Sequence, residues 1–114
     1  MKLLWENTSL DSSFAQQNIT LTDTTWYDLY IFVCVHDTTN KVEMAVPVVP
    51  KVASYGYGSF YFGACDWDST ALSAASRLCA IYREGNAAII YDAYKGSTKD
   101  NTVCIPYKIY GIKF

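Results

Sequence analysis

The chain has a single histidine, His36, so any nucleophile that needs a histidine base would have to use it. The nearest thiol is that of Cys34, two residues earlier in a run of strand-forming residues. Side chains two residues apart on a strand lie about 7 Å from each other, too far for a direct hydrogen bond without a bend. A histidine followed by an aspartate at a strand end is also common in turns. We therefore expect no catalytic residues and no enzymatic activity.

A second candidate site is the run Asp66, Trp67 and Asp68, in which two carboxylates flank an indole. This pattern is typical of a corner of a calcium site or of a platform for a sugar ring. Calcium takes roughly six to eight oxygen ligands, and only Asp92 or Asp100 could add carboxylates from elsewhere. The alternative, which we favour, is a solvated loop with Trp67 packed against the core. No metal site or cofactor is predicted, and the close cysteine pairs typical of zinc sites do not occur.

Aromatic residues and glycines are concentrated between Tyr55 and Phe62, which makes this segment the best candidate for a binding surface. Aromatic rings can stack on sugars, and neighbouring glycines keep such a surface open. The candidate ligand-binding residues are Tyr55, Tyr57, Trp67 and Tyr94. The alternative is that the aromatic residues belong to the core or to an interface between subunits, where Tyr and Trp are enriched. We favour core or interface over a ligand site.

The elements that must position these residues belong to one small domain, residues 1–114, of which 51% is hydrophobic. The net charge is only −2 and no basic stripe exists, so nucleic-acid binding is not expected. No apolar run is long enough for a membrane span, so membrane insertion is not expected either. Without a secretion signal, the four cysteines are expected to be buried free thiols.

Short β-rich runs separated by turn residues predict an all-β protein, a single antiparallel β-sandwich (jelly-roll-like) of about eight short strands. The run 26–35 is apolar on both sides, which indicates a central strand covered on both faces, and Pro47 and Pro50 are expected to end the strand that follows it. Residues 66–76 are expected to form a polar loop with one helical turn at 73–76, and 92–102 a second loop. The strands are predicted at 2–5, 18–22, 26–35, 41–49, 59–63, 77–82, 87–91 and from 103 onward.

Five landmarks occur in order across nearly the whole chain: LLWEN at 3–7, SSFAQQ at 12–17, WYDLYI at 26–31, AVPV at 45–48 and CIPYKIYGIK at 104–113. With these landmarks the chain resembles a family of small β-sandwich domains from tailed bacteriophages. Members of this family form the ends of tail-fibre or receptor-binding-type proteins, or are short virion-associated proteins. The resemblance implies a virion structural or adhesion domain that is made in the host cytoplasm and forms homo-oligomers, with a trimer most natural in a fibre. It implies no catalytic residues.

Two functions remain open from the sequence. The first is receptor binding, in which surface aromatic residues meet carbohydrate of the host cell surface. The second is a purely structural role as a head-fibre, capsid-decoration or tail-attachment subunit that contacts other virion proteins and has no ligand. A binding domain must keep several of its aromatic side chains exposed in one patch, whereas a structural subunit is expected to bury them between copies.

Overall fold

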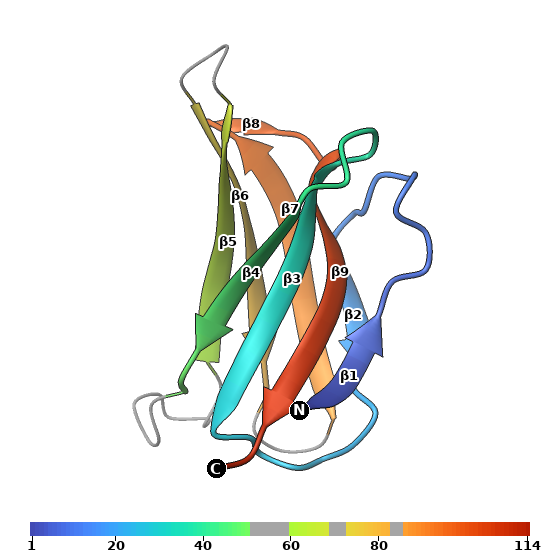
Figure 1. Ribbon diagram of the computed structural model, residues 1–114. Helices are drawn as coiled ribbons and strands as arrows, with labels where there is room; N and C mark the ends of the chain where they lie inside the picture. The colour runs from blue at the N-terminus through green and yellow to red at the C-terminus, as the bar shows by residue number, and fades with distance from the viewer. Residues whose placement is uncertain (51–59, 69–72, 83–85) are drawn as a thin grey trace.

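The computed structural model of the chain describes residues 1–50, 60–68, 73–82 and 86–114, and for 60–68 and 73 it describes the backbone alone. These residues form two antiparallel sheets packed face to face and contain no helix (Figure 1). This confirms the predicted all-β sandwich of about eight strands. No helix long and apolar enough to cross a membrane occurs in these ranges. The strands are β1 (Lys2–Glu6), β2 (Gln17–Thr20), β3 (Leu29–Asp37), β4 (Glu43–Val48), β5 (Phe60–Asp68), β6 (Ser73–Ile81), β7 (Ala87–Lys95), β8 (Thr98–Lys99) and β9 (Val103–Ile112).

The strand order shows how distant parts of the chain meet. The first sheet, called sheet A, has the order β1-β9-β3-β4, and the second, sheet B, has the order β2-β7-β6-β5 with β8 paired to β7. β3–β4, β5–β6 and β6–β7 are antiparallel neighbours along the chain, whereas β1 and β2 lie in different sheets. β9 runs between β1 and β3, so the predicted C-terminal strand is central in sheet A (Figure 1).

The core lies between the sheets and follows the alternation of side chains along each strand. On β3, Tyr30, Phe32 and Cys34 are buried against sheet B, while Leu29 and Ile31 on the other face are half-buried. β3 lies between β9 and β4, as its apolar run predicted. The buried apolar side chains that form the core include Leu4, Phe14, Ile19, Ile81, Ile90, Ile105 and Ile109.

A close contact near the end of β9 depends on a glycine. A Cβ atom built on Gly111 would lie 2.5 to 2.9 Å from carbon atoms of the Tyr27 ring. Tyr27 is buried, and its hydroxyl donates to Asp23 Oδ2 at 2.8 Å. Only the lack of a side chain at position 111 lets this ring pack flat against the strand.

Several predicted boundaries are wrong. The loop and helical turn expected within 66–76 are largely strand, because β5 runs to Asp68 and β6 begins at Ser73. Serine and alanine have little intrinsic preference for strand, so the pairing of this segment with β5 determines its conformation. Pro47 does not end its strand, because β4 is an edge strand, where proline is tolerated. β7 and β8 extend into the loop predicted at 92–102, and the strand predicted from Trp26 begins at Leu29.

Candidate functional site

A buried arginine organises the interior of the sandwich. Among the side chains that the structure describes, Arg77 on β6 is the only charged one that is fully buried, with 1% of its surface exposed. In the part of the chain that the structure describes, its guanidinium donates to four backbone carbonyls, and burial lowers its pKa. The hydrogen bonds run from Nε to Cys104 O (2.8 Å), from Nη1 to Phe14 O (2.9 Å) and Tyr91 O (2.7 Å), and from Nη2 to Val103 O (3.3 Å).

These acceptors come from parts of the chain that are distant in sequence. Val103 and Cys104 begin β9 in sheet A, Tyr91 lies on β7 in sheet B, and Phe14 lies in the segment between β1 and β2. Cys104 has a φ of 46°, which is uncommon for a residue other than glycine, and its carbonyl accepts the Nε bond. Arg77 therefore joins the two sheets and holds the segment before β2 against them.

A second polar network lies beside the first and is centred on Asp92. Asp92 Oδ1 accepts hydrogen bonds from Gln16 N and from Asn101 Nδ2, both at 2.9 Å. Asn101 in turn accepts from Ala93 N through Oδ1 and from Phe14 N through its backbone oxygen, again at 2.9 Å. The Gln16 N–H and then the Asn101 amide hold the pKa of Asp92 below its usual range. The carboxylate is therefore ionised at neutral pH and fixed in position.

Both networks support a hollow of about 210 Å³ on the outer side of sheet B, which we call the Tyr94 hollow. It is lined by Gln16, Ser76, Arg77, Leu78, Tyr91, Asp92 and Tyr94. A register shift between β6 and β7 places Tyr91 and Asp92 opposite Leu78, which opens the surface there. Tyr94 is 43% exposed and Leu78 is 52% exposed, so two large apolar side chains face solvent beside a fixed carboxylate. Such a surface fits a small amphipathic ligand that has an apolar face and a hydroxyl or amine group.

No family model matches this chain, and neither a curated protein nor a solved structure does.

Of the four candidate ligand-binding residues, the structure describes the side chain of Tyr94 and the backbone of Trp67. Tyr94 lines the hollow. The backbone of Trp67 lies on β5 opposite Ala74, across β6 from the strand that carries Tyr94, but its side chain is outside the described part. Tyr55 and Tyr57 also lie outside the described residues.

Sequence reasoning missed most of the residues that surround Tyr94. The sequence predicts that Leu78 lies in a strand, without a functional role, and indicates Asp92 only as a distant candidate ligand for calcium. The one local signal is that an arginine, residue 77, stands within an apolar strand. In the fold Arg77 takes the buried position and Leu78 the exposed one, which is the reverse of what their polarity predicts.

The structure places Cys34 and His36, the pair considered for catalysis, in different environments. Cys34 is completely buried, and burial raises the pKa of its thiol well above the usual value. His36 lies at the end of β3, where its Nε2 is 3.5 Å from Asp37 Oδ2 and its backbone N–H donates to Val42 O at 2.9 Å. The thiol and the imidazole are thus in different environments, one in the core and one beside a turn.

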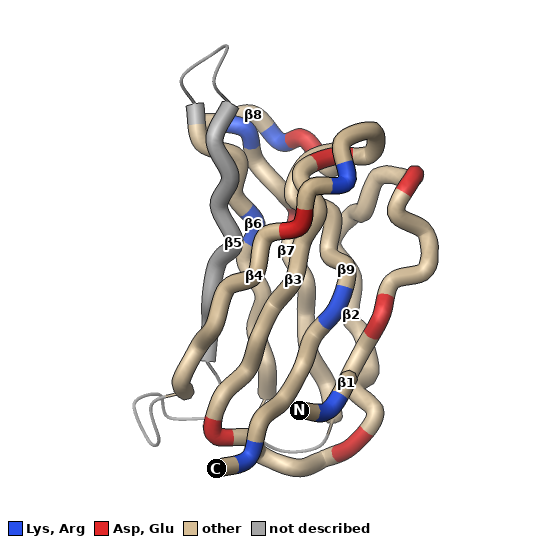
Figure 2. Tube along the Cα trace, viewed as in Figure 1, with Lys and Arg blue, Asp and Glu red and all other residues tan. Residues whose placement is uncertain are grey.

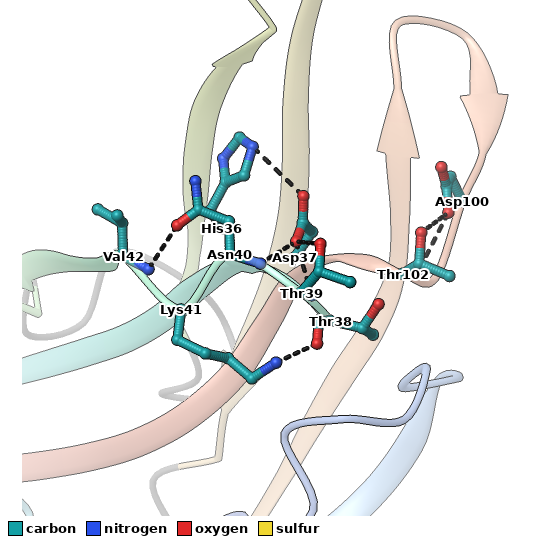
Figure 3. A network of polar contacts seen from close by, with 9 residues as sticks. All are labelled: His36, Asp37, Thr38, Thr39, Asn40, Lys41, Val42, Asp100 and Thr102. Atoms are coloured by element: carbon teal, nitrogen blue, oxygen red, sulfur yellow. Dashed lines mark hydrogen bonds and ion pairs between the residues drawn. The ribbon is translucent and has the colours of Figure 1, made fainter.

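Figure 3 shows that Asp37 stabilises the turn between β3 and β4. Its Oδ1 accepts from Thr39 N at 2.8 Å, from Thr39 Oγ1 at 2.9 Å and from Asn40 N at 2.5 Å. The Asn40 N–H contributes most to lowering the pKa of Asp37. Lys41 Nζ donates to Thr38 O within the same turn. The His36–Asp37 sequence is explained by this turn, as its place at a strand end suggested.

The three cysteines whose side chains the structure describes are all buried. Cys34 and Cys79 are buried free cysteines, as predicted, and Cys104 is also buried. Burial raises the pKa of the Cys79 thiol as well. The side chain of Cys65 lies outside the described part. Within the described ranges, no three His, Cys, Asp or Glu side chains are grouped as metal ligands; the Asp66 and Asp68 carboxylates, weighed as a calcium corner, are outside them.

Proposed function

We propose that this chain is a bacteriophage virion protein that acts as a tail-fibre or receptor-binding type of adhesion domain and recognises carbohydrate on the host cell surface. The observation that carries the proposal is the Tyr94 hollow, in which exposed Tyr94 and Leu78 lie beside the ionised Asp92. The phage context comes from the resemblance of the sequence landmarks.

The chemistry of the hollow favours a sugar over a wholly apolar ligand. A sugar ring has an apolar C–H face that can stack on a tyrosine, and hydroxyl groups that can donate to a carboxylate. The hydrogen bonds from Gln16 and Asn101 both go to Oδ1 of Asp92 and hold the carboxylate in place, so a ligand hydroxyl would donate to Oδ2. A fixed acceptor loses little conformational entropy when the ligand binds. The volume is below the roughly 300 Å³ of the smaller drug-sized pockets, so we propose that one sugar ring occupies it.

The test is binding of the purified chain to an array of bacterial surface polysaccharides, including lipopolysaccharides and teichoic acids. Tyr94→Ala should weaken binding about tenfold or more, since large aromatic contacts dominate most binding sites. Tyr82→Ala is the matched control, because Tyr82 is a half-buried tyrosine that directly follows β6 and does not line the hollow. Equal affinity of the Tyr94→Ala variant and the native chain would exclude the hollow as the sugar site. Alanine variants of Tyr55, Tyr57 and Trp67 extend the assay to the other candidate residues.

The alternative proposal is a purely structural virion subunit without a ligand. The observation that favours it is the apolar outer face of sheet A, since a subunit that contacts other virion proteins needs a surface to bury. If the native chain binds none of the polysaccharides but is present in stoichiometric amount in purified virions, the structural role replaces adhesion.

A further inference from the structure

A lysine on the short strand β8 stands beside the Tyr94 hollow. β8 pairs with β7 so that Lys99 lies directly opposite Tyr94, and Ser76 on β6 lies opposite Tyr94 on its other side. Residues directly opposite each other in an antiparallel pair project from the same face, with Cβ atoms about 5 Å apart. Tyr94 and Lys99 are exposed, and Ser76 is half-buried. One row on the outer face of sheet B therefore carries a hydroxyl, an aromatic ring and an ammonium group.

Asp92 shares this face with the row. It lies two positions before Tyr94 on β7, and Ala93 between them is buried. The Gln16 N–H and the Asn101 amide do most to lower the pKa of Asp92, and the charge of Lys99 adds to their effect. Two residues along a strand span about 7 Å. The hollow thus has a fixed carboxylate at one end and the row with the ammonium group at the other.

Two cations act on the hollow against one acid. Among the described residues that line it, Asp92 is the acid, and Arg77 is a buried cation whose N–H groups donate to backbone carbonyls. Lys99 adds an exposed cation, while Asp100 and Lys95, the other charged residues beside β8, balance each other. Figure 2 shows basic positions on and beside β8, at one end of sheet B. The charges around the hollow therefore sum to a positive value, which favours an anionic ligand.

We infer, on the basis of the proposed function, that the hollow takes an acidic sugar, one whose ring carries a carboxylate or a phosphate group. The ring stacks on Tyr94, a ring hydroxyl donates to Asp92 Oδ2, and the acid group lies against the ammonium of Lys99. A sugar ring with an acid group outside the ring spans the distance between the two ends of the hollow. An amino sugar would instead place a like charge beside Lys99.

Matched pairs of polysaccharides test the class of ligand. Polymers that contain uronic acids are compared with their carboxyl-reduced forms, and phosphorylated polysaccharides with their dephosphorylated forms. The native chain should bind the acidic member of at least one pair about three- to fivefold more tightly than the neutral member, since an exposed ion pair contributes modestly. This preference should fall as the salt concentration rises, because salt screens exposed charges. The two kinds of pair distinguish a carboxylate ligand from a phosphate ligand.

Variants of Lys99 test where the preference arises. Lys99→Gln should bring the ratio of the two affinities close to one, and Lys99→Glu should favour the neutral member. Lys113→Glu is the matched control, because it changes the net charge equally at an exposed lysine just beyond β9. It should keep the preference of the native chain. Circular dichroism and urea unfolding establish that all three variants are folded.

The outcomes separate the acidic ligand from the sugar site itself. Equal affinity of the native chain for both members of every pair overturns the acidic class. If Tyr94→Ala then weakens binding to both members, the proposed sugar site still stands. A preference that survives in Lys99→Gln, or that Lys113→Glu also abolishes, overturns the role of Lys99. A native chain that binds no member of any pair overturns the acidic class and the sugar site together.

Discussion

Replacement of Arg77 by methionine should destabilise the protein more than any single loss of apolar contact on the same strand. The guanidinium donates four hydrogen bonds to carbonyl oxygens of Phe14, Tyr91, Val103 and Cys104. Methionine has a similar length and an unbranched apolar chain, so it fills much of the same space without donating. The variant therefore removes the hydrogen bonds without creating a large cavity.

The expected magnitude follows from two opposing contributions. Each buried carbonyl that loses its donor costs about 1 to 3 kcal/mol, so four give roughly 4 to 12 kcal/mol. Removal of a buried charge returns several kcal/mol of desolvation free energy. We expect a net loss of about 3 kcal/mol in the free energy of unfolding, which is a large share of the roughly 5 to 15 kcal/mol typical of a domain.

Urea unfolding followed by tryptophan fluorescence measures this loss. The control is Ile81→Val on the same strand, which removes one methyl group from a buried side chain and should cost about 1 kcal/mol. Hydrogen exchange at Gln16 adds a local readout, because its N–H is bonded to Asp92 in the segment that Arg77 holds through Phe14 O. That amide should exchange faster in Arg77→Met than in Ile81→Val. If Arg77→Met costs no more than the control and leaves Gln16 protected, the hydrogen bonds of Arg77 do not hold the sandwich together.

Two further predictions concern other parts of the fold. Gly111→Ala should lower the free energy of unfolding by about 1 to 3 kcal/mol, because the new methyl group would overlap the Tyr27 ring. Urea unfolding checks this, and a second change, Tyr27→Leu, should recover part of the loss if the overlap is the cause. Asp92→Asn should make stability less dependent on pH in acid. The folded-state pKa of Asp92 is lowered, so its contribution is present above the unfolded value of about 4 and is lost as the pH falls through the folded value. The urea midpoint between pH 7 and pH 3 should therefore fall less steeply in the variant than in the native chain, and parallel curves would contradict the assignment.

The strands with the strongest local signals were those that the sequence predicted best. β3 and β9 are long runs of branched and aromatic residues, and their central positions in sheet A agree with that composition. The start of β6 was missed because its serine and alanine residues have no strong preference, and a neighbouring strand determines their conformation. The composition of a segment predicted its secondary structure only where its residues have a strong intrinsic preference for strand.

The candidate site was less predictable for a related reason. An arginine in the middle of a strand is ordinarily expected to face solvent, since charged side chains are rarely buried unless they are paired. Arg77 is buried because carbonyl groups near residues 14, 91 and 103–104 converge on it, and this convergence exists only in the folded chain. The sequence singled out Tyr94 as an aromatic candidate, but its neighbours Leu78 and Asp92 come together through the β6–β7 register shift.

The two outer faces of the sandwich make the proposals separable. Sheet B carries a hollow lined by Arg77 and Asp92, whereas the outer face of sheet A carries an uncharged row through Tyr110 and Ile31, with Lys108 and Glu6 in the next row. A change at Ile31 should therefore leave sugar affinity per copy unchanged, whereas a change at Tyr94 should lower it. If copies are held in one particle, several weak sites acting together would raise the apparent affinity for a repetitive polysaccharide.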